Sequence, residues 1–147
     1  MGWFPRRSRL VAEAAGAAQG LVDTSVVIDL DHIDAGQLPR ELAVSALTMA
    51  ELAAGPHATG DTAERARRQD RLQRAEATFD PLPFDGEAAR AYGRIYAAIV
   101  ATGRKARGPR AVDLLIAATA LAVNLPLYTR NVDDFRGIDH LLAVVSV

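Results

Sequence analysis

Acidic side chains that lie far apart in this chain of 147 residues are the groups best suited to do chemistry together. They are Asp23, Glu51, Asp113 and the neighbouring pair Asp133 and Asp134. Two carboxylates about 4 Å apart repel by roughly 4 kcal/mol at an effective dielectric constant of about 20, so a cluster stays ionised only beside a cation. The chain has no cysteine and no clustered histidines, so oxygen ligands would favour Mg²⁺ or Mn²⁺ over zinc. Such an ion activates water and stabilises a leaving oxygen, which predicts phosphoryl chemistry.

The elements that must position these acids alternate between strands and helices. Thr24 is expected to cap the first helix. The nearly continuous apolar segment 111–123 predicts a buried helix. This alternation predicts an α/β fold, a three-layer α/β/α sandwich with a mainly parallel central sheet. The expected strands are residues 21–22, 42–47, 127–129 and 141–147, and the expected helices are residues 25–33, 48–55, 61–78, 85–101 and 111–123.

A parallel sheet would bring the acids together, because the carboxyl ends of its strands meet at one edge. Asp23 follows the first expected strand, and Glu51 lies in the first helical turn after the second. The pair 133–134 follows the strand 127–129. Asp113 opens the helix whose far end leads into that same strand, so its own end lies near the carboxyl edge.

Each acid also has an ordinary structural explanation. Asp23 could cap a helix, and Glu51 could form a capping box with Thr48. Asp113 could complement the dipole of its helix, although its apolar neighbours would bury it and a buried unpaired carboxylate costs several kcal/mol. The pair 133–134 could be turn residues. These explanations account for the acids singly and less easily for their joint pattern.

Basic residues are concentrated in one loop, although the net charge of the whole chain is only −1. This loop, together with Arg130 after the strand 127–129, is suited to hold a phosphodiester backbone, while a solvated turn is the alternative. The arginine-rich helix 61–78 balances its own acids and is interpreted as a solvated face. The expected backbone-binding residues are Arg104, Lys105, Arg107, Arg110 and Arg130.

The first twenty residues are interpreted as an N-terminal extension, helical or disordered, that precedes a single domain at 21–147. The alanine-rich stretch 10–18 is interrupted by Glu13, which argues against a secretory signal. No run approaches the 18 or so apolar residues of a membrane span, and the absence of cysteine fits a reducing cytoplasm.

Four motifs, taken together, resemble those of PIN-domain ribonucleases, and most of all those of VapC toxins from type II toxin–antitoxin pairs. The resemblance covers residues 21–147, and each motif alone is weak. The motifs are Leu21-Val-Asp23-Thr24-Ser25, Ser45-Ala-Leu-Thr48-Met-Ala-Glu51, Ala111-Val-Asp113-Leu-Leu-Ile and Thr129-Arg-Asn131-Val-Asp-Asp134-Phe135.

The resemblance implies a Mg²⁺- or Mn²⁺-dependent endoribonuclease that cuts transfer or ribosomal RNA, forms homodimers and is inhibited by a cognate antitoxin. Asp23 and Asp113 match the principal metal ligands, and Glu51 matches the second acid. Asp134 matches the fourth, with Asp133 and Asn131 as alternatives. The resemblance further implies that other polar groups orient the carboxylates or water, namely Thr24, Ser25 and Thr129, with Asn131 beside them.

A competing hypothesis is a catalytically silent binding module that has kept an acidic pocket on the same fold. A phosphatase or phospho-acceptor domain is disfavoured, because the chain lacks an Asp-x-Asp motif and its only lysine is Lys105. No glycine-rich phosphate-binding loop is present either.

Overall fold

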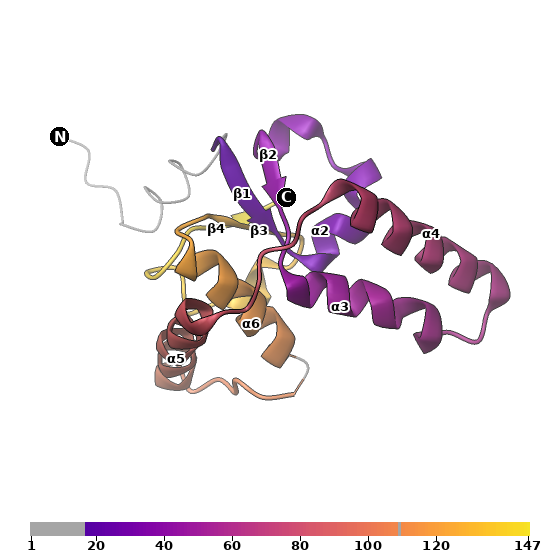
Figure 1. Ribbon diagram of the computed structural model, residues 1–147. Helices are drawn as coiled ribbons and strands as arrows, with labels where there is room; N and C mark the ends of the chain where they lie inside the picture. Colours follow the sequence, from indigo (N-terminus) through magenta and orange to yellow (C-terminus); the bar gives the residue numbers. More distant parts are fainter. Residues whose placement is uncertain (1–16, 109) are drawn as a thin grey trace.

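A four-stranded, entirely parallel sheet forms the centre of the computed structural model, which describes residues 17–108 and 110–147. The strands lie in the order β2-β1-β3-β4 (Figure 1). Strand β1 is therefore central, although its neighbour β3 follows it by more than a hundred residues. The strands are β1 (Gln19–Val22), β2 (Glu41–Ala43), β3 (Leu127–Thr129) and β4 (Val144–Ser146).

Helices connect the strands and cover both faces of the sheet. The three long helices expected from the sequence are present with nearly the expected bounds, and Asp61 and Asp85 cap two of them through their carboxylates. The helices are α2 (Thr24–Ile28), α3 (Ala46–Ala54), α4 (Thr62–Thr78), α5 (Gly86–Ala101) and α6 (Arg110–Ala122).

Alternating side chains along the strands build two separate cores, which defines the three layers. Leu21 and Leu127 pack with α5 and α6 on one face of the sheet. Val22 and Tyr128 pack with residues of α2, α3 and α4 on the other (Figure 1). The α/β/α sandwich expected from the sequence is therefore confirmed.

Two helix starts differ from the sequence expectation. Asp23, and not Thr24, caps α2, and this helix ends at Ile28 before a short 3-10 helix, Leu30–His32. Ser45 caps α3, so Glu51 does not form a capping box with Thr48. The apolar run 42–47 was expected to be a strand, but its second half is the cap and first turn of a helix. A short apolar run fits both periods, and the Ser45 hydroxyl, which accepts from the Thr48 N–H, decides for the helix.

The strands at the two ends of the domain also differ from their expected bounds. Strand β1 begins at Gln19, two residues earlier than expected, and β4 covers only residues 144–146, in the second half of the expected strand 141–147. The expectation of an N-terminal extension concerns residues 1–16 as well, and these lie outside the described residues. Within the described residues, no helix is both long enough and apolar enough to cross a membrane.

Candidate active site

Asp23 lies at the carboxyl end of the central strand and is buried. Its backbone N–H donates to the Tyr128 carbonyl at 3.0 Å, which extends the pairing of β1 with β3 by one residue. Its Oδ1 accepts from the Val26 N–H at 3.1 Å and from the Ser25 hydroxyl at 2.5 Å. Asp23 is thus the cap of α2, and its carboxylate is held in place by two donors.

Glu51 reaches the same edge of the sheet from α3. Its Oε1 accepts from the Thr24 hydroxyl at 2.6 Å, and this hydroxyl also lies 3.1 Å from the hydroxyl of the buried Thr48. Thr24 therefore joins the start of α2 to the carboxylate on α3. The expected orienting role of Thr24 has a direct contact behind it.

Asp113, in the first turn of α6, has the most strongly perturbed carboxyl among the described residues. Its pKa is raised from 3.8 to about 6, chiefly by burial and then by the negative charges of Asp134, Asp23 and Glu51 in that order, while Arg110 lowers it. Four acids from four separate parts of the chain therefore act on one another, as the topology predicts.

The other three acids lie near enough for their charges to affect Asp113, but the four do not surround a common point. Across the two described ranges, no three acidic or histidine side chains are gathered tightly enough to hold a metal ion as they stand. The donor set nevertheless suits a hard divalent cation, because it consists of carboxylate oxygens and the ionised form of the half-buried Asp113 is disfavoured by the charges of the other three.

The structure distinguishes between the candidates for the fourth acidic position. Asp134 is half-buried in the short 3-10 helix Val132–Phe135 and is the carboxylate with the largest effect on Asp113. Asp133 is exposed and pairs with Arg136 at 2.8 Å, which lowers its pKa. Asn131 is exposed, and its backbone N–H donates to the buried hydroxyl of Thr129 at 3.0 Å. Asp134 is therefore the acid that faces the others.

The basic loop before α6 lies beside the acids. Arg104, Lys105, Arg107 and Arg110 line a hollow of about 390 Å³. Arg110 is close enough to lower the pKa of Asp113. This hollow therefore borders the edge of the sheet where Asp23, Glu51, Asp113 and Asp134 lie, called the acidic edge below. Four of the five residues expected to hold the RNA backbone therefore lie together around one hollow.

Two of the expected backbone-binding arginines already have partners within the protein. Arg104 donates to the carbonyls of Asp133 and Arg136, both at 3.1 Å, and so ties the basic loop to the segment after β3. The Arg130 guanidinium lies 3.5 Å from the Asp29 carboxylate, and the Arg130 backbone N–H donates to the Ser25 hydroxyl. Lys105 and Arg107 are exposed and are the more available of the five.

The polar network beneath Glu51 was not predicted from the sequence. The buried Ser45 and Thr48 contact each other through their hydroxyls at 3.4 Å, and Thr48 contacts Thr24. A serine three residues before a threonine at the end of an apolar run is a helix-capping pattern, so this signal was available. The network fixes the position of α3 relative to α2.

Comparisons with known proteins agree with this arrangement. The PIN domain family matches residues 20–141. Ribonuclease VapC5 of Mycobacterium tuberculosis strain H37Rv is 35% identical over 130 residues, which cover 86% of this chain and 93% of that protein. Ribonuclease VapC8 of Mycobacterium tuberculosis strain CDC 1551 is 39% identical over 102 residues, which cover 69% of this chain and 89% of that protein.

A solved structure shows the same likeness in three dimensions. The crystal structure of a member of the VapBC family of toxin–antitoxin systems, VapBC-5 from Mycobacterium tuberculosis, matches with a TM-score of 0.78 and 35% sequence identity. The match covers 88% of this chain and 99% of that chain. The family match, the two relatives and the shared fold together show that this chain belongs to the PIN-domain family, within its VapC group.

Proposed function

We propose that this protein is a metal-dependent endoribonuclease toxin that cuts cellular RNA and is neutralised by a cognate antitoxin. The observation that carries the proposal is the half-buried Asp113 carboxyl, whose pKa is raised to about 6 beside three further carboxylates. A structural role does not account for such a group, because its ionised form is disfavoured by burial and by its neighbours. The relatives named Ribonuclease VapC support the choice of RNA as substrate.

Asp23 and Asp113 are the residues that would hold the ion, with Glu51 and Asp134 completing the acidic group. When bound, Mg²⁺ or Mn²⁺ would supply a water of lowered pKa and positive charge for the leaving oxygen. Such an ion is commonly held by one or two carboxylates together with water, so the described carboxylates need not enclose it.

The remaining polar residues orient the acids and hold the RNA. Ser25 fixes one oxygen of Asp23 and Thr24 fixes one oxygen of Glu51. Thr129 accepts from the N–H of Asn131 and so shapes the turn that leads to Asp134. On the rim, Arg104, Lys105, Arg107, Arg110 and Arg130 supply the positive charge that would place a phosphodiester across the carboxylates.

The finer parts of the proposal concern partners. We propose transfer or ribosomal RNA as the substrate, action in the cytoplasm, and a homodimer as the active assembly. An antitoxin is proposed because the VapBC-5 structure is that of a toxin–antitoxin system. Its inhibitory segment would place a basic side chain against the acidic edge, where charge attraction is strongest.

The decisive experiment compares Asp113→Asn with Asp133→Asn in cleavage of purified RNA with Mg²⁺, with Mn²⁺ and with a chelator. Asp133 is a matched control, because it is an acid of the same region that is exposed and paired with Arg136. We expect Asp113→Asn to lower the cleavage rate by about a thousandfold or more, because four carboxylates in one site act as a unit. Asp133→Asn should retain most of the activity, and the chelator should abolish it.

The same variants test the silent-module alternative in cells. Induction of the wild-type chain without antitoxin should arrest growth, and induction of Asp113→Asn should not. Cleavage by Asp113→Asn at the wild-type rate in Mg²⁺, with both proteins folded, would refute the assignment of the site. If the wild-type chain neither cuts RNA nor arrests growth, the silent module becomes the better description.

A further inference from the structure

Helix α4 carries five arginines, and four of them have partners within the described part of the chain. Arg65 donates to two backbone carbonyls, and Arg67 and Arg68 contact Glu64. Arg74 lies 3.1 Å from Asp70 and 3.9 Å from Asp31. The expectation of a solvated face that balances its own acids therefore describes most of this helix.

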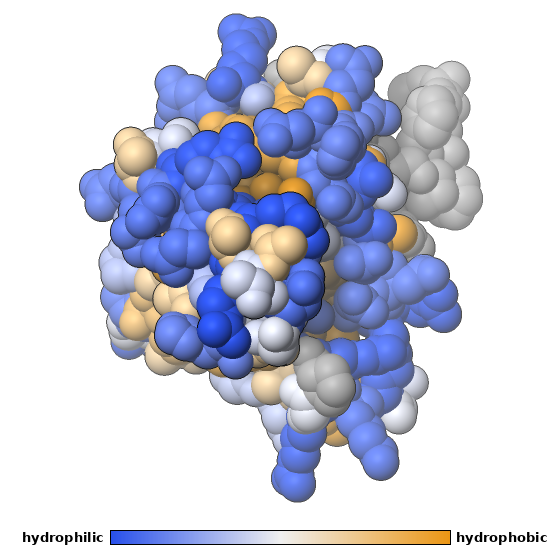
Figure 2. All heavy atoms as spheres, turned by 90° about the vertical axis from the view of Figure 1, so that its right-hand side faces the viewer, coloured by the Kyte–Doolittle hydropathy of each residue, from blue (hydrophilic) through white to orange (hydrophobic). Residues whose placement is uncertain are grey.

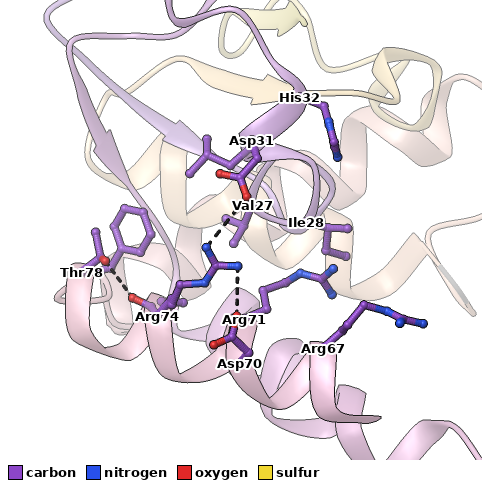
Figure 3. A pocket seen from close by; sticks show the side chains of 12 residues that line it. Val27, Ile28, Asp31, His32, Arg67, Asp70, Arg71, Arg74 and Thr78 are labelled. Carbon is purple, nitrogen blue, oxygen red and sulfur yellow. Dashed lines mark hydrogen bonds and ion pairs between the residues drawn. The ribbon is translucent and has the colours of Figure 1, made fainter. Parts of the chain in front are cut away.

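Arg71 differs from the other four. It is half-buried, yet its side chain has no ion pair or hydrogen bond with any residue in 17–108 or 110–147. Figure 3 shows its guanidinium extended toward Ile28, between the paired Arg74 and the outward-pointing Arg67. Within the described residues no side-chain nitrogen is both fully buried and without a partner, so solvent reaches this guanidinium, and its five N–H groups are free to bind an anion.

The hollows around Arg71 connect it with the candidate active site. One hollow, of about 340 Å³, lies between α4 and the segment around Ile28 and His32 (Figure 3). A second, also of about 340 Å³, is lined by Thr24 and Glu51. Arg71 and Ile28 line both hollows. The Arg71 side chain therefore lies between the first hollow, along α4, and the second hollow, which reaches Glu51 at the acidic edge. On this side of the molecule, hydrophilic side chains surround a depression with apolar side chains at its floor (Figure 2).

We infer that Arg71 binds a phosphate of the RNA strand as the strand passes along α4 to the carboxylates at the end of the sheet. The inference rests on the proposed nuclease function and adds a second substrate-binding surface, on the opposite side of Glu51 from the basic loop. A guanidinium can hold two phosphate oxygens at once, and its surroundings here are partly shielded from water, which strengthens the contact. The apolar Ile28 beside it offers a surface on which a ribose or base can lie.

The test measures binding of a short, fluorescein-labelled single-stranded RNA of mixed sequence, in a chelator so that no cleavage occurs. Arg71→Gln is compared with Arg71→Lys, which keeps the charge, and with Arg74→Gln, which removes a paired arginine from the same groove. We expect Arg71→Gln to weaken binding several-fold at low salt and to reduce the slope of log K against log salt by about 0.7, the value for one phosphate contact on a single strand. Arg71→Lys should keep the slope, because it keeps the charge, but recover only part of the affinity, and Arg74→Gln should change both little.

Cleavage kinetics then separate this inference from the nuclease proposal. For Arg71→Gln we expect a several-fold higher KM with kcat nearly unchanged, because the contact is made equally in the bound state and the transition state. Unchanged RNA affinity and KM in Arg71→Gln, with wild-type binding and cleavage intact, would refute the role of Arg71 alone. Weaker inhibition by the antitoxin with unchanged RNA binding would overturn it in favour of a protein partner. A wild-type chain that neither binds nor cuts RNA would overturn both proposals.

Discussion

At the scale of single residues, the acidic edge is a compromise between folding and charge. Asp23 is stabilised by two donors and by its place as a helix cap. Asp113 has the opposite situation, because burial and three neighbouring carboxylates disfavour its ionised form. A folded protein keeps such a group only where its charge is used.

This imbalance predicts that Asp113→Asn stabilises the metal-free protein. The pKa of Asp113 rises from 3.8 in the unfolded chain to about 6 in the folded one, so its contribution to stability is fully present below about pH 4 and is lost as the pH rises through 6. The full shift corresponds to about 3 kcal/mol, and solvent screening at this half-exposed site reduces the expected gain to about 1–2 kcal/mol.

Urea unfolding of both proteins in chelator, at about pH 4 and about pH 7.5, measures this effect. The advantage of Asp113→Asn should be small in acid and should grow toward neutral pH, because the wild-type carboxyl then ionises in the folded state. An equal difference at the two pH values would show that the charge of Asp113 is not the cause.

The sequence predicted which acids meet, but could not choose between adjacent ones. A parallel sheet requires Asp23, Glu51 and Asp113 to approach the same edge, and they do. Asp133 and Asp134 differ by one position in a short 3-10 helix, so the direction of each depends on the turn rather than on spacing along the chain. The pairing of Asp133 with Arg136 favours Asp134 as the fourth acid, and the i, i+3 spacing of that pair does not by itself show that the pair forms.

At the scale of elements, the helices with strong caps were predictable and the short strands were less so. Asp61 and Asp85 each precede a long helical segment and mark its start. Strands of three or four residues have no comparable signal, and the boundary between β2 and α3 depends on the cap formed by the Ser45 side chain and on backbone pairing of residues 44–46 with Leu82.

This dependence predicts that Ser45→Ala lowers both stability and RNA cleavage. The substitution removes the acceptor for the Thr48 N–H and a buried hydroxyl contact, which should lower the free energy of unfolding by about 1–2 kcal/mol. Because α3 carries Glu51, cleavage should fall as well.

Asp85→Ala is the matched control, since it removes the cap of α5, a helix that carries none of the proposed site residues. It should cost about 1 kcal/mol in a urea titration and leave the rate of cleavage nearly unchanged. If Ser45→Ala and Asp85→Ala lost equal activity, the loss would be due to lower stability of the whole fold and not to a displaced α3.

At the scale of the whole molecule, the central strand β1 packs closely beside β3 in the sheet. Gly20 permits this, because a Cβ atom at this position would lie 2.5 Å from Cε1 of the buried Tyr128. The ring of Tyr128 is enclosed by the core on the same face, so it has little room to move.

We therefore predict that Gly20→Ala destabilises the fold by about 1–3 kcal/mol, the usual cost of overpacking. Gly93→Ala on α5 is the control, since no heavy atom lies within 4 Å of a Cβ atom at that position. This second change should stabilise the protein by about 0.5–1 kcal/mol through the higher helix propensity of alanine. Thermal unfolding of both variants, followed by circular dichroism, gives the comparison.

The order of strands in the sheet also has a consequence for folding during translation. Strand β1 is made first, but it lies between β2 and a strand that is synthesised more than a hundred residues later. Asp134, whose charge acts on Asp113, follows that strand. A nascent polypeptide attached to the machinery that reads RNA therefore cannot assemble the complete acidic edge until these late residues have been made.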